Sequence, residues 1–369
     1  MIPVNKPIIT GKDAKYIFKT AQSGWISSTG PEIKIFEKSF QRYIGKKFAA
    51  TVSSGTAALE ISLKCLNLKK NDEVIIPNFT IISNLLAVIK VGAKPIAIDC
   101  DIKTWNMDIG LIEKAISKRT KAIIATHIYG YPIEIDKIKK ICKKKKIYLI
   151  EDAAEVIGHD YKNKKCGFFG DLSVFSFYAN KHITTGEGGM ILTNNSQFYK
   201  KIQSFKNLCF GKINRYNHDD IGWNYRFTNL QASLGISQLN RIASIVKKKK
   251  EIGELYYNYL KNNKSIYIQS PTYKGLKNIY WVVGILILNK KITADEIRKK
   301  LYKYGIDTRA FFWPMSKQKI LKKYKIKLSG NFNNSEILSK YGFYLPSGLG
   351  TTKKEIKFVS EKLNNLLLG

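Results

Sequence analysis

Lys181 lies at a position that favours a reactive amine over a solvent-exposed surface lysine. It lies between an aromatic, β-like run over 172–178 and a glycine-rich turn over 186–189, and Ser176 lies on the same loop. A lysine amine held between a buried strand and a tight turn can act as a nucleophile toward a carbonyl compound. The reaction in which Lys181 takes part depends on which other functional residues the chain places near it.

A second group of candidates follows an earlier expected strand. In TVSSGTAAL, Ser53, Ser54, Gly55 and Thr56 lie between a strand and a helix, so that backbone N–H groups and hydroxyls meet at the positive end of the helix dipole. This arrangement suits a bound anion such as a phosphate. The alternative is a helix cap with no ligand, because the stretch matches neither a Walker loop nor a dinucleotide fingerprint.

Two further strand ends carry a carboxylate and an aromatic ring. In IYLIEDAAE, Glu151 and Asp152 end a buried strand, where a carboxylate could hold a cationic ring nitrogen or cap a helix. In DEVIIPNFT, Phe79 follows a strand, where it could stack on a flat cofactor or belong to the core. Taken in order with the anion cradle, Ser176 and Lys181, these residues form the set that a pyridoxal phosphate enzyme needs. We therefore interpret Lys181 as the point of cofactor attachment.

Composition narrows the class of protein. The chain has 369 residues, is 44% hydrophobic and carries 63 basic against 28 acidic residues, a formal net charge of +35. Lysine runs at 143–146 and 247–250 adjoin apolar residues at helical spacing, so we expect them on the wet faces or ends of amphipathic helices. No nucleic-acid-binding motif accompanies them, and an anionic small substrate suits a basic protein equally well.

Cysteine and histidine usage points to a reducing compartment and to no metal site. The five cysteines are scattered without a Cys-x-x-Cys pair, and the four histidines lack metal-ligand spacing. No apolar run reaches membrane-spanning length, and the first residues lack the features of a signal peptide. We expect a cytoplasmic protein with no membrane insertion.

Alternation of strand-like and helix-like segments sets the fold class. Short β-branched segments, apolar on both faces, alternate with helical patterns, which predicts an α/β architecture with a mostly parallel sheet covered by helices on both faces. The strands are expected at 47–52, 72–77, 94–99, 121–127 and 147–154. A single long helix over 228–260, with a capping box at Thr228 and Gln231, is expected to connect two domains. We predict a large domain over 1–249 and a smaller α+β domain over 250–369.

The chain resembles the DegT/DnrJ/EryC1/StrS family of sugar aminotransferases over nearly its whole length. The stretches that carry the resemblance are SGWISSTGPEIKIFE, SSGTAAL, DEVIIPNFT, THIYGYP, LIEDAAEVIG, GDLSVFSFYANKHITTGEGGM, GWNYRFTNLQASLGISQLNRI and DTRAFFWP. The resemblance implies an aspartate-aminotransferase-like fold (fold type I), pyridoxal 5'-phosphate as cofactor, and a homodimer with active sites shared between subunits.

The resemblance also assigns roles to individual residues. It implies that Lys181 carries the cofactor and that Asp152 pairs with the pyridine nitrogen. The remaining implied contacts are Gly55, Thr56 and Ser176 with the phosphate, Asn224 with the phosphate in the neighbouring subunit, Phe79 with the ring face, Glu155 with the ring hydroxyl, and Trp25, Arg226 and Arg309 with the amino donor or nucleotide sugar.

The implied reaction moves the amino group of L-glutamate to C4 of a nucleotide-linked 4-keto-6-deoxysugar, GDP-linked by preference, for surface glycans such as O-antigen. Ser316 departs from the family, because many relatives carry histidine at that place, which leaves UDP- or dTDP-linked sugars as alternatives. Dehydratases of the family carry histidine at the lysine position, whereas this chain keeps Lys181 and has His182 beside it. A distant alternative is a regulatory or nucleic-acid-binding protein on an aminotransferase scaffold.

Overall fold

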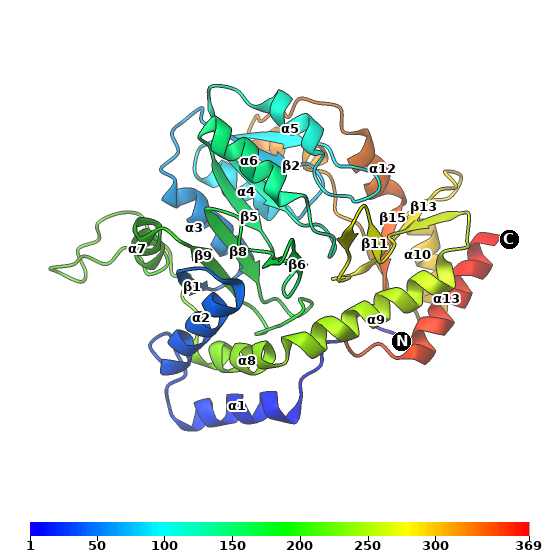
Figure 1. Cartoon of the computed structure of the whole chain (residues 1–369), viewed down its shortest axis with the longest axis horizontal. Helices are drawn as coiled ribbons and strands as arrows, with labels where there is room; N and C mark the ends of the chain where they lie inside the picture. Colours follow the sequence, from blue (N-terminus) through cyan, green and yellow to red (C-terminus); the bar gives the residue numbers. More distant parts are fainter. Residues whose placement is uncertain (369) are drawn as a thin grey trace.

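A seven-stranded sheet forms the centre of the computed structural model, which describes residues 1–368 (Figure 1). The second strand from one edge runs antiparallel to both of its neighbours, and all other neighbouring strands pair in parallel. In spatial order the strands are β1 (Phe48–Val52), β9 (Gly189–Thr193), β8 (Leu172–Ser176), β5 (Tyr148–Asp152), β4 (Thr120–Thr126), β2 (Glu73–Pro77) and β3 (Lys94–Ile98). The expected mostly parallel sheet is confirmed.

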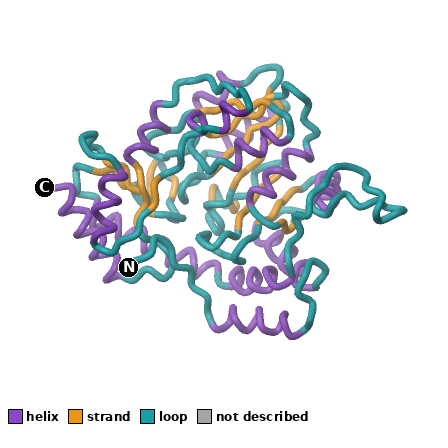
Figure 2. The backbone as a smooth tube through the Cα atoms, turned by 180° about the vertical axis from the view of Figure 1, so that it is seen from behind, coloured by secondary structure: helices purple, strands orange, loops and turns teal. Residues whose placement is uncertain are grey.

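Helices cover both faces of this sheet because alternate strand residues are apolar on both sides (Figure 2). In β4, Ile123 and Ala125 join one core, whereas Ala122 and Ile124 join the other. The first core is closed by α2 (Pro31–Ile44), α5 (Ile109–Ala115), α6 (Ile135–Lys145) and α8 (Asn229–Asn240), and the second by α3 (Gly55–Cys65), α4 (Ser83–Lys90) and α7 (Ser196–Phe205). Outside these layers, α1 (Gly11–Gln22) packs on α8, and β6 (Asp160–Tyr161) pairs with β7 (Lys164–Lys165).

A smaller antiparallel sheet with its own core follows in the chain, as predicted. Its spatial order is β10 (Ile266–Ile268), β13 (Val283–Ile287), β15 (Gly342–Leu345) and β14 (Arg309–Ala310). The other elements of this region are the hairpin of β11 (Thr272–Tyr273) and β12 (Leu276–Lys277), the 3-10 turn η1 (Met315–Lys317), and helices α10 (Ala294–Lys303), α11 (Ile320–Lys323), α12 (Asn333–Tyr341) and α13 (Lys353–Leu368). Gly369, the last residue of the domain predicted from the sequence, lies outside the described residues.

The connection between the two sheets differs from the single helix that was expected. The helix breaks at Arg241, which ends α8 and precedes α9 (Ile242–Leu260). The Arg241 guanidinium donates to the Ile8 carbonyl and to Asp13, so contacts with the N-terminal segment hold the chain in its non-helical conformation there. The capping box of Thr228 and Gln231 begins α8 as expected. The boundary proposed at 249/250 falls inside α9, which runs unbroken past it (Figure 1).

One of the two lysine runs contradicts the expectation of a wet helix face. Residues 143–146 are exposed at the end of α6, as expected. In α9, however, Lys249 is buried, because it lies one helical turn after Ile245 and one before Ile252, on the inward face. Its amine donates to the carbonyls of Trp281, at 2.8 Å, and Ser347.

Within the described residues, no helix combines the length and apolar character needed to cross a membrane. The thiols of all five cysteines are free and buried.

Candidate active site

A cavity of about 350 Å³ opens where β5 and β8 end and α3 begins. Carboxyl ends of parallel strands and the start of a helix meet there, which is where open α/β sheets bind ligands. The residues lining it include Ser54, Gly55, Thr56, Ile81, Ser83, Asp152, Glu155, Ser176, Tyr178, Asn180, Lys181, Trp281, Arg309, Phe312 and Tyr344. The cavity thus combines the large sheet's strand ends with side chains from the smaller domain.

Lys181 brings a buried amine into this cavity. Its Nζ lies 3.9 Å from Oε1 of Glu155 and 3.7 Å from the centre of the Trp281 ring. Burial lowers the pKa of Lys181, against the opposing negative charges of Glu155 and Asp152. An amine in these surroundings is a better nucleophile at neutral pH than a solvated lysine.

The two carboxylates at the end of β5 face opposite sides of the sheet. Asp152 lines the cavity, and its three hydrogen-bond partners are neutral: the Asn84 amide and the Thr126 hydroxyl, both at 3.4 Å, and the Ala154 N–H at 3.2 Å. Burial raises the pKa of Asp152, because these partners and the charge of Lys181 only partly offset desolvation. A buried carboxylate with neutral hydrogen-bond partners is well suited to a cationic ligand atom.

Glu155 lies beside Lys181 at the base of the cavity. Its Oε2 accepts a hydrogen bond of 2.7 Å from the Tyr129 N–H. Burial raises the pKa of Glu155 to about 8, although the charge of Lys181 works in the other direction. While Oε2 is held by the Tyr129 N–H group, Oε1 of Glu155 faces the amine of Lys181.

The predicted anion cradle has the geometry of an open helix start. The Ser54 hydroxyl caps α3 by accepting from the Ala57 N–H at 3.1 Å, and the Thr56 hydroxyl lies 2.7 Å from that of Ser83. A Cβ added at Gly55 would come within 2.9 Å of the Ser176 Cβ, so only glycine leaves this space open. The N–H groups and hydroxyls of this helix start would suit a phosphate.

Phe79 does not reach the cavity. It is fully buried and packs edge-on against Tyr129, Phe311 and Phe312, with ring centres 5.9 Å apart in each case. Ile81, two residues later, lines the cavity instead. The expectation that Phe79 offers a stacking face is thus not met in this chain, because the segment turns its ring into the core.

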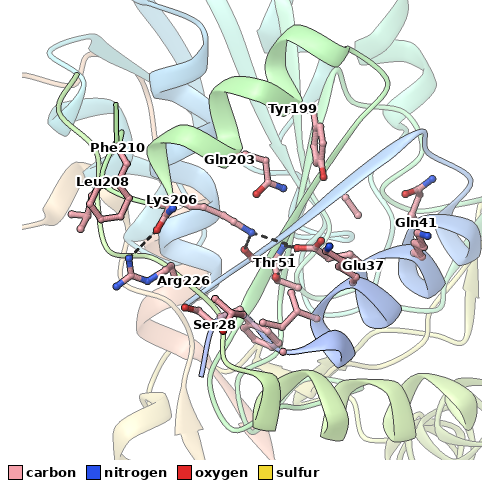
Figure 3. Close-up of a pocket in the computed structure, with 18 of the residues that line it drawn as sticks. Ser28, Glu37, Gln41, Thr51, Tyr199, Gln203, Lys206, Leu208, Phe210 and Arg226 are labelled. Carbon is pink, nitrogen blue, oxygen red and sulfur yellow. Dashed lines mark hydrogen bonds and ion pairs between the residues drawn. The ribbon is translucent and has the colours of Figure 1, made fainter. Parts of the chain in front are cut away.

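The residues assigned to substrates are divided between two regions. Arg309, at the start of β14, lines the cavity, but Arg226, Asn224 and Trp25 do not. Arg226 donates to the Asn207 side chain at 2.8 Å and lines a larger cavity of about 930 Å³ between α2, β1 and α7 (Figure 3). Asn224 is exposed, and Trp25 is 56% exposed. Within one chain, these three residues lie apart from Lys181.

Sequence reasoning missed the residues that the smaller domain contributes. Trp281, Phe312 and Tyr344 close the cavity from that side. Their only sequence signal is that each is an aromatic residue at or near a short strand, which is equally typical of a core position. Ser316, the departure from the family pattern, is tied to Asn78 by hydrogen bonds of 2.9 and 3.2 Å and is not among the lining residues.

The cavity fits pyridoxal phosphate by the chemistry of its side chains. Lys181 supplies a buried amine, Asp152 a buried carboxylate without a charged hydrogen-bond partner, and the start of α3 an open set of N–H and hydroxyl donors. A carbonyl, a basic ring nitrogen and a phosphate are the three groups that this set complements.

Comparison with known proteins agrees with this arrangement. The model of the DegT/DnrJ/EryC1/StrS aminotransferase family matches residues 7–364. The chain is 36% identical to the GDP-perosamine synthase of Escherichia coli O157:H7, over 98% of each chain, and 35% identical to that of Vibrio cholerae, over 99% of each. Its structure is similar to that of Helicobacter pylori PseC, an aminotransferase of pseudoaminic acid biosynthesis, with a TM-score of 0.92 at 25% identity, covering 100% of this chain and 99% of that one.

Proposed function

The chain belongs to the DegT/DnrJ/EryC1/StrS aminotransferase family, and from that membership we propose that it converts GDP-4-keto-6-deoxymannose to GDP-perosamine with L-glutamate as amino donor. It is a sugar aminotransferase that uses pyridoxal 5'-phosphate. The observation that carries the proposal is the meeting of Lys181 and Asp152 in one cavity beside an open helix start, in a chain whose relatives of similar length are named GDP-perosamine synthase.

The side chains divide the work of holding the cofactor. Gly55, Thr56 and Ser176 would bind the phosphate, Asp152 would pair with the ring nitrogen and keep it protonated, and Glu155 would lie beside the ring hydroxyl. When bound, pyridoxal phosphate supplies an electron sink and carries the amino group between the two substrates. Burial of Asp152 strengthens its interaction with a cation, because little water competes for the carboxylate.

Lys181 is the group that moves protons. Its amine would hold the cofactor at rest and, when free, would take the α-proton of the donor at Nζ. In the second half of the reaction the same nitrogen returns a proton to C4 of the sugar. Trp281, Phe312 and Tyr344 exclude water on the side of the smaller domain, and Arg309 at the same wall is placed to bind a carboxylate or phosphate of a substrate.

We propose that the enzyme is a homodimer with shared active sites. What supports this is that Asn224 is exposed and outside the Lys181 cavity. It pairs with Asn207 at the base of the loop that follows α7, and this loop extends away from the body of the chain (Figure 1). Ile213, Tyr216 and Ile221 on this loop are more than 70% exposed, and such apolar side chains favour burial against a second copy. We also place the reaction in the cytoplasm, because all five thiols are free.

A substrate panel tests the proposal. Purified protein, supplied with the cofactor and L-glutamate, is given GDP-, UDP- and dTDP-linked 4-keto-6-deoxysugars, and amino-sugar and 2-oxoglutarate formation are both measured. We expect the GDP-linked sugar to be turned over best, and Lys181→Ala to abolish turnover and the visible absorbance of the lysine-bound cofactor. Equal or better turnover of a UDP- or dTDP-linked sugar would contradict the substrate assignment. Normal turnover by Lys181→Ala would contradict the role of Lys181.

A further inference from the structure

The amine of Lys181 lies directly over an indole ring. Its Nζ is 3.7 Å from the centre of the Trp281 ring, within the range in which a cation is attracted by the face of an aromatic system. Trp281 is buried, so little water weakens this attraction. Glu155, at 3.9 Å, is the partner on the other side of the amine.

Hydrogen bonds hold both the indole ring and the backbone of Trp281. Its Nε1 donates a hydrogen bond of 2.9 Å to the carbonyl of Asn180, the residue that precedes the lysine. The backbone carbonyl of Trp281 accepts a hydrogen bond of 2.8 Å from the buried amine of Lys249 in α9. The ring also stacks on Phe312 with an interplanar angle of 19°. These contacts leave the ring face little freedom to move relative to the lysine.

We propose that Trp281 is a positioning residue that holds the free ε-ammonium group of Lys181 against its indole face between the two proton transfers. The inference rests on the proposed function, in which this amine is released from the cofactor and must stay within reach of the substrate carbon. Without the ring, the released amine would gain rotamer freedom, and its charged form would lose a stabilising contact.

The other charged groups around the amine set the background for this contact. Asp152 and Glu155 face it from β5 and the residues that follow, and Arg309 and Glu187 line the same cavity. Burial lowers the pKa of Lys181, whereas the charges of Glu155 and Asp152 raise it. The face of an indole ring also favours the charged form of an amine. A desolvated cation–π contact corresponds to a shift of about one pKa unit.

Fluorinated tryptophans test the contact without changing the shape of the site. Each fluorine weakens the negative potential of the ring face and keeps the N–H group. Cofactor-free protein containing tryptophan with zero, one, two or three indole fluorines is labelled with acetic anhydride across a range of pH, and the peptide with Lys181 is quantified by mass spectrometry. We expect the pH midpoint for Lys181 labelling to fall stepwise, by about one unit over the series.

The matched control is Trp281→Phe containing the same analogues, because the chain has five tryptophans and four of them remain. We expect no stepwise change in that variant. A constant midpoint in the unmutated protein, or equal steps in Trp281→Phe, would overturn the inference. The labelling involves neither substrate nor turnover, so an enzyme that fails the sugar panel can still show the steps, and an active enzyme can lack them.

Discussion

Two adjacent acidic residues at the end of β5, Glu151 and Asp152, face opposite sides of the sheet and have different roles. Asp152 faces the cavity, whereas Glu151 faces the opposite layer and accepts hydrogen bonds from His127 and from the N–H groups of Gly167, Phe169 and Gly170. Burial alone would raise the pKa of Glu151, but His127 and the N–H donors bring it below its usual value. Glu151 therefore holds the 167–170 loop, and Asp152 remains for a ligand.

Replacing each acid by its amide separates these roles. Asp152→Asn would remove the proposed ionic partner of the ring nitrogen, and we expect turnover to fall by about two to three orders of magnitude, as when other preorganised electrostatic groups are removed. Glu151→Gln is the control, because its NH₂ group would face N–H donors and leave one or two without an acceptor. We expect it to lower the free energy of unfolding by about 1–3 kcal/mol. Near-normal turnover in Asp152→Asn would mean that this carboxylate is only structural.

For single residues, the position of a local motif was predictable from the sequence. The direction of a side chain in the loop that follows a strand was not. Ser54, Gly55 and Thr56 form their cradle within one turn of chain, so strand-helix order was enough to place them. Phe79 follows its strand by two residues, and its direction depends on Phe311 and Phe312, more than 200 residues later. No local pattern carries that information.

In helix α9, the burial of Lys249 follows from its position in the helical repeat but not from the lysine-rich composition of its segment. Lys249 was expected to be solvated because its run of four lysines adjoins apolar residues at helical spacing, including Ile242, Ile245 and Val246. The inward face of the helix nevertheless passes through Ile245, Lys249 and Ile252, a spacing that could have identified it. The two partners of its amine, the carbonyls of Trp281 and Ser347, lie 32 and 98 residues later in the chain and could not be inferred.

A pH-dependent stability follows from the burial of Lys249. Burial lowers its pKa to about 7 in the folded chain, against 10.5 for an ordinary lysine. Between these values the unfolded chain binds more protons, so this residue makes the free energy of unfolding rise with pH, by at most about 1.4 kcal/mol per pH unit. Lys249→Met should remove this contribution.

Urea unfolding of both proteins at pH 7, 8 and 9 checks this. We expect the free energy difference, unmutated protein minus Lys249→Met, to grow with pH. Lys46 and Lys206 are also buried with lowered pKa, but they are present in both proteins and cancel in the difference. A difference that stays constant from pH 7 to 9 would show that Lys249 keeps its proton in the folded chain, as a solvated lysine does.

For the whole molecule, the order of elements was enough to predict the mostly parallel sheet, its helices on both faces and the smaller α+β domain. The border placed at 249/250 lies within α9, and the N-terminal segment pairs with the smaller domain through Ile2 and Ile306. Pairing between residues some 300 positions apart leaves no local trace. The role proposed for Asn224 also depends on a second copy of the chain.

Complementation tests the proposed sharing of sites between subunits. Lys181→Ala and Asn224→Asp should each be inactive alone, the second because a carboxylate would face the phosphate. In a two-fold dimer of one subunit of each kind, one site receives both changes and the other neither. With random exchange of equal amounts, half of the dimers are mixed and half of their sites are whole, so about a quarter of normal activity should return.

The mixed dimer is isolated with two different affinity tags before its rate is measured. The control is each variant carrying both tags, mixed with itself. If the verified mixed dimer is as inactive as its parents, Lys181 and Asn224 serve one site from the same chain, and the shared-site arrangement is wrong.

The pairing of the N-terminal segment has a consequence for synthesis on the ribosome. The N–H of Ile2 bonds to the carbonyl of Gly305, and the carbonyls of Val4 and Lys6 accept from Ser347 and Gly350. At about 5–20 residues per second, the ribosome needs roughly 15–60 s to make the intervening 300 residues. During that time the large sheet can form, but the first residues have no partner. Translation speed, rather than the stability of any one strand, therefore sets the earliest moment at which the smaller domain can close on Lys181.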